Sequence, residues 1–230
     1  MTTPIQGLCS MATRGLLDEL AAAYAQHTGV PVSFLAIGGV EAARRVSAGE
    51  PFDVVVLASD AIDKLAAAGK LDAAGKTDLV RSGVAAAVCA GAPRPDISTE
   101  EALRSSVLAA PRIAYSTGPS GTALMALFER WGIAGDIRGR LVQAPTGVPV
   151  GSLLARGDAE LGFQQLSELI GVEGIELIGP LPPAVQITTV FTAAPGIGGG
   201  AQPEAVRALL DFMRSADSAD TKRRHGMEPA

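Results

Sequence analysis

Short apolar runs alternate with amphipathic stretches along most of the chain. The run at 52–57, FDVVVL, is apolar at consecutive positions, which is typical of a strand buried on both faces of a parallel sheet. In the stretch 12–27, Leu16, Leu20 and Tyr24 recur at the spacing of one helical face. This alternation of buried strands with amphipathic helices predicts an α/β fold.

The same criteria, applied to the whole chain, predict nine strands and seven helices. The predicted strands cover residues 5–9, 32–37, 52–57, 84–89, 112–115, 141–143, 159–164, 176–178 and 185–193. The predicted helices cover 12–27, 40–48, 61–68, a stretch opening after Thr99, 122–131, 150–155 and 203–215.

The late apolar run AVQITTVFTAA, at 184–194, predicts a strand that returns from one lobe to the other. We therefore expect two lobes, each a mostly parallel sheet flanked by helices. The first lobe is discontinuous and covers residues 1–80 and 193–230, and the second is an insertion that covers 81–192.

Composition narrows the class of protein. The 230 residues are 47% hydrophobic, which is enough apolar content to offset the chain entropy lost on folding and argues against disorder. A net charge of -5 argues against a nucleic-acid partner, and no apolar run is long enough to cross a bilayer. Basic residues cluster only at Lys222, Arg223 and Arg224, which we interpret as the solvated end of a C-terminal helix.

Several kinds of chemistry lack their sequence signals. Cys9 and Cys89 belong to no CxxC or Cys/His cluster, so we expect no metal site. We interpret both as small buried side chains, and a disulfide between them is the alternative. The nucleotide fingerprints are missing, so no cofactor is expected. His27 and His225 lie away from every serine turn, which argues against a Ser-His-Asp triad.

The N-terminus has no basic segment followed by an apolar region, and the first cation is Arg14. An export signal would need both features. As it stands, the sequence predicts a cytoplasmic protein, or a periplasmic one if the chain is a trimmed mature form.

Five strand ends are followed by small or hydroxyl residues at the start of a helix. The first turns of helices carry unpaired N–H groups and partial positive charge, and ligands of open α/β sheets bind at the carboxyl ends of strands. Taken together, the five turns predict a site for an anion. For each turn alone, ordinary helix capping remains the alternative. The turns are Ser10, Gly38–Gly39, the segment 58–60, the segment 116–121 and Thr146–Gly147.

Two cations and one amide add to these candidates. Arg14 lies one helical turn after Ser10, and Arg81 lies at the predicted crossing between lobes, where it would hold a carboxylate or form an interlobe ion pair. Gln164 ends a strand of the second lobe and can donate to the same ligand. The full set of candidate ligand-binding residues is Ser10, Met11, Arg14, Gly38, Gly39, Ser59, Arg81, Ser116, Thr117, Gly118, Ser120, Thr146, Gly147 and Gln164.

Three blocks carry a resemblance to a known family: GGVEAARRVSAGEPFDVVVLASD, YSTGPSGTAL and VPVGSLLARGDAELGF. Their order resembles the type II periplasmic solute-binding proteins, and within these the molybdate-binding proteins of ABC importers. The resemblance implies a two-lobed fold, a small anionic ligand and an ABC permease as partner if the chain is exported. Gln164–Gln165 stand where the family usually has a tyrosine, so a small polycarboxylate competes with a tetrahedral oxyanion as ligand.

An aconitate isomerase also resembles this family, which implies an enzymatic alternative. A shift of a C=C bond along an unsaturated tricarboxylate needs carboxylate anchors and a positioned base. Arg14 and Arg81 are candidate anchors. The catalytic base remains unknown, with Glu41, Asp60 and Lys64 as candidates by position only.

Overall fold

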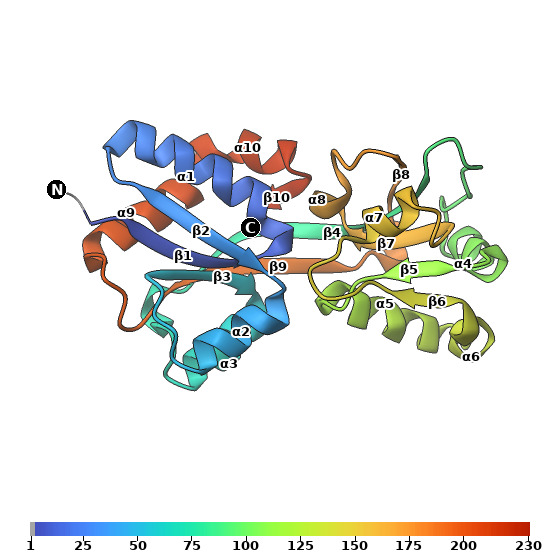
Figure 1. The fold of residues 1–230 in the computed structure, drawn as a ribbon, viewed down its shortest axis with the longest axis horizontal. Coiled ribbons are helices and arrows are strands. Elements are labelled where there is room, and N and C mark those ends of the chain that lie inside the picture. The colour runs from blue at the N-terminus through green and yellow to red at the C-terminus, as the bar shows by residue number, and fades with distance from the viewer. Residues whose placement is uncertain (1–2) are drawn as a thin grey trace. The chain divides into compact units, whose positions relative to one another are not determined.

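A computed structural model describes residues 3–230 of the chain, shown in Figure 1. Contacts divide these residues into two compact units. Unit 1 runs up to Arg81 and resumes as Val190–Ala230, and unit 2 is Ser82–Thr189. Strands β4 (Thr77–Cys89) and β9 (Thr188–Pro195) each begin in one unit and end in the other. The predicted α/β fold is confirmed.

Unit 1 is built on the strand order β2-β1-β3-β9, in which the first three strands are parallel and β9 is antiparallel to β3. Besides β9 and the first part of β4, the strands of this unit are β1 (Ile5–Ser10), β2 (Val32–Ile37), β3 (Val54–Ala58) and β10 (Met227–Pro229). Its helices are α1 (Arg14–Thr28), α2 (Gly39–Ser47), α3 (Ser59–Ala67), α9 (Pro203–Arg214) and α10 (Ala219–Arg224).

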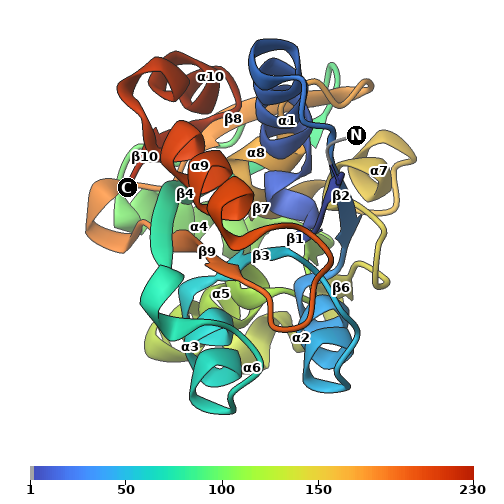
Figure 2. The same ribbon diagram turned by 90° about the vertical axis from the view of Figure 1, so that its left-hand side faces the viewer.

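Helices cover both faces of this sheet because the strand residues alternate between two apolar clusters. Val54 and Val56 of β3 pack with α1 and α9, whereas Val55 and Leu57 pack with α2 and α3. Figure 2 shows the result, with α1, α9 and α10 on one side of β1, β2 and β3 and with α2 and α3 on the other. The apolar run at 52–57 is therefore buried on both faces, as its pattern predicted.

Unit 2 has its own sheet, in which β5 lies between β6 and β7 and is parallel to both. β4 continues the sheet beyond β7, antiparallel to β7 and β8. The remaining strands are β5 (Ile113–Tyr115), β6 (Leu141–Gln143), β7 (Leu161–Gln165) and β8 (Ile175–Pro180). The helices are α4 (Glu100–Ala109), α5 (Pro119–Arg130), α6 (Ala134–Ile137), α7 (Val150–Ala155) and α8 (Leu166–Leu169).

The two faces of the second sheet are covered unequally. Phe128 and Phe163 belong to the larger cluster, which α4, α5 and α6 cover, while Ala85, Ala87 and Ala114 form the face under α7 and α8. Both layers can be followed in Figure 1. The small alanine side chains allow the short helices α7 and α8 to pack close to the strands.

The structure departs most clearly from the sequence-based predictions at four places. β4 begins at Thr77, earlier than the predicted 84, because the polar residues of its first half hid the strand. α5 begins at Pro119 and not at 122, because proline is compatible with the first helical turn. β9 begins at Thr188, after a short 3-10 turn at Pro183–Val185 in place of the predicted strand start at 185. The helix at 203–215 does not close the chain, because α10 and β10 follow it.

The basic cluster near the C-terminus is also not uniformly solvated. Lys222 of α10 is only 2% exposed, and burial lowers the pKa of its ammonium. Arg223 and Arg224 remain exposed and pair with Asp220 and Glu19 respectively. The interpretation of this cluster as a solvated helix end therefore fails at Lys222, because α10 packs against α1 and β10.

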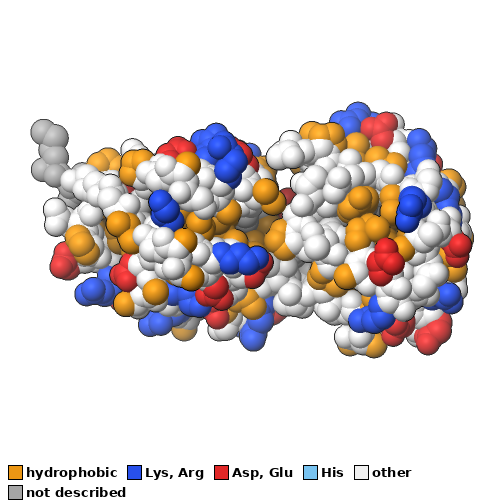
Figure 3. All heavy atoms as spheres, turned by 90° about the horizontal axis from the view of Figure 1, so that it is seen from below, with side chains coloured by type: hydrophobic (Ala, Val, Ile, Leu, Met, Phe, Trp, Pro, Cys, Tyr) orange, Lys and Arg blue, Asp and Glu red, His pale blue; other side chains and the backbone are white. Residues whose placement is uncertain are grey.

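Within residues 3–230, the structure holds no cluster of side chains suited to a metal ion, and none of its helices has the length and hydropathy to cross a membrane. Both cysteines are free thiols; Cys9 is buried, which raises its pKa to about 12, whereas Cys89 is only partly buried. Basic and acidic side chains are interspersed on the face drawn in Figure 3.

Candidate functional site

The carboxyl ends of three parallel strands meet at one edge of the unit 1 sheet. β1 is the middle strand of the three, so Ser10 at its end lies between the ends of β2 and β3. β2 leads into Gly38 and Gly39 at the start of α2, and β3 leads into Ser59 at the start of α3. The structure therefore brings Ser10, Gly38, Gly39 and Ser59 together, as parallel strands require.

Ser10 has an unusual environment. Its residue is 7% exposed, and its Oγ is buried without a hydrogen-bond partner among residues 3–230. A Cβ placed on Gly39 would lie 3.9 Å from the Ser10 Cβ, so the hydroxyl stands beside the first turn of α2. A buried hydroxyl without a partner costs about 1–3 kcal/mol. Such groups are rare and call for an explanation, which a ligand oxygen would supply.

The other candidates of unit 1 lie in different surroundings. Met11 opens a short 3-10 helix directly after Ser10 and is partly buried. Arg14 is exposed and forms an ion pair with Asp18 at 3.6 Å. Arg81 is exposed on β4 and donates from Nη2 to the carbonyl of Pro229 at 2.9 Å. Neither arginine is joined by a hydrogen bond or ion pair to the strand-end residues around Ser10.

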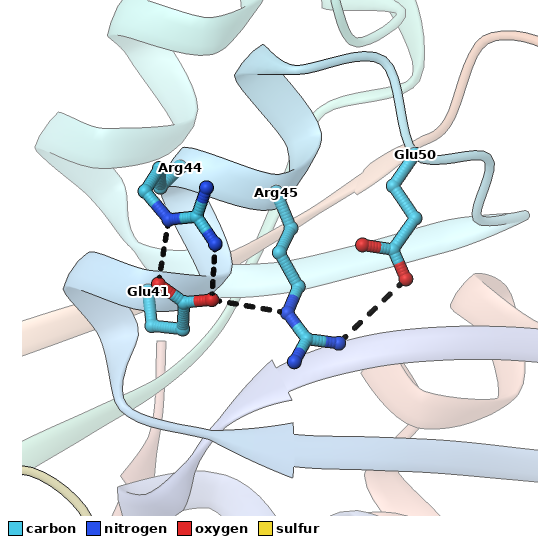
Figure 4. A network of polar contacts seen from close by, with 4 residues as sticks. All are labelled: Glu41, Arg44, Arg45 and Glu50. Carbon is cyan, nitrogen blue, oxygen red and sulfur yellow. Dashed lines mark hydrogen bonds and ion pairs between the residues drawn. The ribbon is translucent and has the colours of Figure 1, made fainter.

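The charged residues of α2 are engaged with one another. Figure 4 shows Glu41 bound by Arg44 in a two-bond pair, with both N···O distances at 2.7 Å, and by Arg45 at 3.2 Å. Arg45 also lies 3.7 Å from Glu50. Hydrogen bonds from the two arginines lower the pKa of Glu41 to about 2, which makes it a poor proton acceptor. The other two candidates for a base, Asp60 and Lys64, are exposed and pair at 3.6 Å.

The corresponding edge of unit 2 repeats this arrangement. β5 is again the middle strand and is followed directly by Ser116, whose Oγ lies 3.1 Å from the Oγ of Ser120 in the first turn of α5. Gly118 caps α5, and the exposed Thr117 lies between it and Ser116. Gly121 is required here, because a Cβ at this position would lie 1.8 Å from the Ser116 carbonyl oxygen.

The two neighbouring strands end in the remaining candidates. β6 leads to Thr146 and Gly147, both exposed, and Gly147 has a φ of 80° that favours glycine. Gln164 at the end of β7 is 3% exposed. Its Oε1 accepts the N–H of Val150, the first residue of α7, at 2.8 Å. Gln164 thus holds α7 in place. Its amide nitrogen carries two N–H groups; one donates to Glu168, and the other is left over.

Glu168, on α8, was not singled out from the sequence. Its carboxylate accepts a hydrogen bond from Gln164 Nε2 at 2.8 Å, and burial raises its pKa to about 7. The neighbouring Ser167 Oγ is, like that of Ser10, buried and without a partner in the described part of the chain. The sequence signal was weak, because a Ser-Glu pair after a strand is also typical of an exposed helix start.

The raised pKa of Glu168 predicts a pH-dependent stability. A carboxyl group whose pKa is higher in the folded state stabilises the fold below its unfolded value of about 4.5, and this contribution is lost as pH rises through about 7. Relative to Glu168→Gln, the wild type should lose up to about 3 kcal/mol between pH 4.5 and pH 8. Urea denaturation at several pH values measures this difference.

Glu173→Gln serves as the control, because Glu173 is an exposed glutamate between α8 and β8. Its stability difference from the wild type should stay flat over the same pH range. A flat difference for Glu168→Gln would contradict the predicted protonation.

A cavity of about 470 Å³ lies elsewhere in unit 1. Asp53, which precedes β3, and Gly196, which follows β9, are among the residues that line it. It therefore opens near the amino end of β3, at the edge opposite Ser10, and none of the candidate residues lines it. We regard the strand-end residues as the better site because the unpartnered hydroxyl lies there.

Comparison with known proteins agrees with this fold. The family model for bacterial extracellular solute-binding proteins matches residues 5–228, and the chain belongs to this family. The resemblance to type II periplasmic binding proteins seen in the sequence is thereby confirmed.

One sequence relative and two solved structures illustrate what this chain is similar to. An aconitate isomerase from a Pseudomonas species is 37% identical over 99% of this chain and 88% of its own length. The periplasmic molybdate-binding protein of Azotobacter vinelandii is 20% identical, with a TM-score of 0.81 over 97% of this chain and 98% of its own. The sulfate-binding protein SubI of Mycobacterium tuberculosis is 18% identical, with a TM-score of 0.80 over 99% of this chain and 87% of its own.

Proposed function

We propose that this protein binds a small polyvalent anion through hydroxyl and main-chain N–H groups at the carboxyl ends of its parallel strands. The observation that carries the proposal is the buried, unpartnered hydroxyl of Ser10 beside the first turn of α2. An oxyanion or carboxylate at this position would accept from Ser10 and from the free N–H groups of the helix. Ser116 and Ser120 offer the same chemistry in unit 2.

The ligand we favour is a small polycarboxylate, with a tetrahedral oxyanion of the molybdate type as the competitor. The most similar relative reported above acts on aconitate by its name, whereas the molybdate and sulfate binders share only the fold. The exposed hydroxyls of Thr117 and Thr146, both in unit 2, would suit a ligand with several separated carboxylates. Delivery to an ABC permease by an exported form of the protein is part of this proposal, supported by the family's description as extracellular.

A second candidate function is isomerisation of an unsaturated polycarboxylate in the same site. It is favoured by the 37% identity to an aconitate isomerase over nearly the whole chain. Binding of the anion is common to both functions, so binding is tested first.

Thermal-shift and calorimetric measurements with molybdate, tungstate, sulfate, trans-aconitate and tricarballylate test the binding proposal. A ligand present at 100 times its Kd should stabilise the fold by about 2.7 kcal/mol. If none of these anions raises the melting temperature, the proposal is wrong.

Ser10→Ala should separate binding from folding. Removing a buried hydroxyl that has no partner leaves stability unchanged or raises it by about 1 kcal/mol. Loss of its hydrogen bond to a charged ligand should weaken binding by about tenfold or more. Ser33→Ala, at an exposed position of β2, is the matched control and should change neither quantity. Unchanged affinity in Ser10→Ala would remove Ser10 from the site.

A further inference from the structure

Glu168 lies where an ionised carboxylate is desolvated and has few polar partners. It lies on α8, which begins directly after β7 at the strand-end edge of unit 2. Its side chain is partly buried, and the bond from Gln164 Nε2 at 2.8 Å is its one hydrogen bond within residues 3–230. No lysine or arginine of the described residues forms an ion pair with it. A buried carboxylate normally acquires a cationic partner or several donors.

The elements packed against α8 offer no compensating charge. α7 (VGSLLA) and β7 (LGFQQ) contain no charged residue. β8 contains Glu176, which is already paired with Arg94. Desolvation is therefore the main influence on the carboxyl group, and its pKa of about 7 leaves comparable amounts of its acid and base forms at neutral pH. A group in that state both accepts and donates protons efficiently.

The direction of the carboxylate is fixed by its neighbour. Gln164 uses Oε1 to accept from the Val150 N–H at 2.8 Å, so its amide nitrogen is turned toward Glu168. This is the arrangement of a base and an orienting group. Ser167, one residue earlier, adds a buried hydroxyl without a partner in the described chain. Ionisable groups shifted by desolvation cluster at functional sites more often than elsewhere.

Glu168 also lies beside the other strand ends of unit 2. β7 pairs with β5 in the register Tyr115 with Phe163, so Gln164 follows on one strand where Ser116 follows on the next. An anion bound by Ser116 and the first turn of α5 would therefore lie at the same sheet edge as Gln164, one strand away, with the Gln164 side chain turned to the face that α7 and α8 cover. The proton-accepting group and the proposed anion-binding groups share one edge of the sheet.

From this geometry we propose that Glu168 is the proton-transfer residue of the anion site, acting on an unsaturated polycarboxylate, with Gln164 as its positioning residue. The ionised carboxylate takes a proton from the saturated carbon next to a ligand carboxylate. The electron pair of that C–H bond forms a new C=C bond, and the original C=C bond shifts its electrons to its far carbon. The Glu168 acid returns the proton there, so the ligand is isomerised and nothing is consumed.

This proposal rests on the anion-binding function, and one experiment distinguishes the two. Wild type, Glu168→Gln and the control Glu173→Gln are incubated with trans-aconitate in D₂O, and proton NMR follows deuterium incorporation and the isomeric product. Calorimetry in parallel measures binding of tricarballylate, which has no C=C bond to move. Wild type and Glu173→Gln should exchange and isomerise, at a rate that rises with pH through about 7.

Glu168→Gln should lose at least a hundredfold in exchange rate while its tricarballylate affinity stays within a few-fold. Glu168→Asp keeps the carboxyl group but shortens the side chain by one methylene, and it should retain partial exchange. This variant shows whether a loss in Glu168→Gln comes from the missing carboxyl group or from a folding defect. Exchange at the wild-type rate in Glu168→Gln would overturn the proposal, and so would a wild type that binds anions without exchange. A wild type that binds none of the anions would overturn the binding function as well.

Discussion

Gly121→Ala should destabilise unit 2 by about 3 kcal/mol and abolish tight anion binding. A Cβ at this position would lie 1.8 Å from the Ser116 carbonyl oxygen and 3.3 Å from its Oγ. The nearest atom belongs to the backbone at the end of β5, which the neighbouring strands hold on both sides. The first turn of α5 must therefore move away from Ser116, which separates the hydroxyls of Ser116 and Ser120.

Guanidinium chloride denaturation and calorimetry with the best anion measure the two effects. Gly135→Ala is the matched control, because Gly135 lies in α6 with nothing near its added Cβ. Alanine has the higher helix propensity, so this variant should be as stable as the wild type or up to about 1 kcal/mol more stable. Equal behaviour of the two alanine variants would show that the close approach of α5 to Ser116 has no energetic importance.

Asp53→Ala should cost about 3 kcal/mol of unfolding free energy. Asp53 is 5% exposed, and its two carboxylate oxygens accept from the N–H groups of Gln6 and Ala201, each at 2.7 Å. It thereby joins β1 to the segment before α9, 148 residues away from itself. Alanine would leave two N–H groups without acceptors, and hydrogen bonds to charged groups contribute about 1.5–3 kcal/mol each.

Urea denaturation tests this expectation in a series. Asp53→Asn keeps one acceptor oxygen and turns an amide donor toward the other N–H, so it should lie between wild type and Asp53→Ala. Asp217→Ala, at an exposed position, should stay within about 0.5 kcal/mol of the wild type. Because Asp53 lies at the edge opposite Ser10, its loss should lower stability without changing intrinsic anion affinity. A variant as stable as wild type would contradict the assigned hydrogen bonds.

Much of the fold followed from local patterns. The elements Val32–Ile37, Leu141–Gln143 and Val150–Ala155 begin and end where the sequence predicted. Each has a pattern that matches one secondary structure and clear boundaries of glycine, proline or polar residues. The first half of β4, from Thr77, was missed because its polar residues give no strand period and its pairing comes from distant parts of the chain.

The candidate site was predictable in its position but not in its interactions. Turns between a strand and a helix can be recognised in the sequence, and parallel strands bring these turns to one edge of the sheet. In contrast, nothing local reveals that Arg81 donates to the carbonyl of Pro229, far along the chain. Glu168 was missed for the same reason. Its burial depends on the contacts of α8 with α7, which precedes it in the chain, and with β8, which follows it. Burial and pairing are tertiary properties.

The repeated middle strand, which ends in a serine next to a helix start, has a consequence for how this scaffold evolves. In the proposed site, much of the attraction for an anion comes from peptide N–H groups, which every amino acid except proline supplies. What a replacement can alter is the handful of side chains, such as Ser10 and Ser116, that decide which shape the peptide groups accept. Descendants of one ancestor can thus exchange one negatively charged guest for another, or gain chemistry on it, while the architecture beneath stays unchanged.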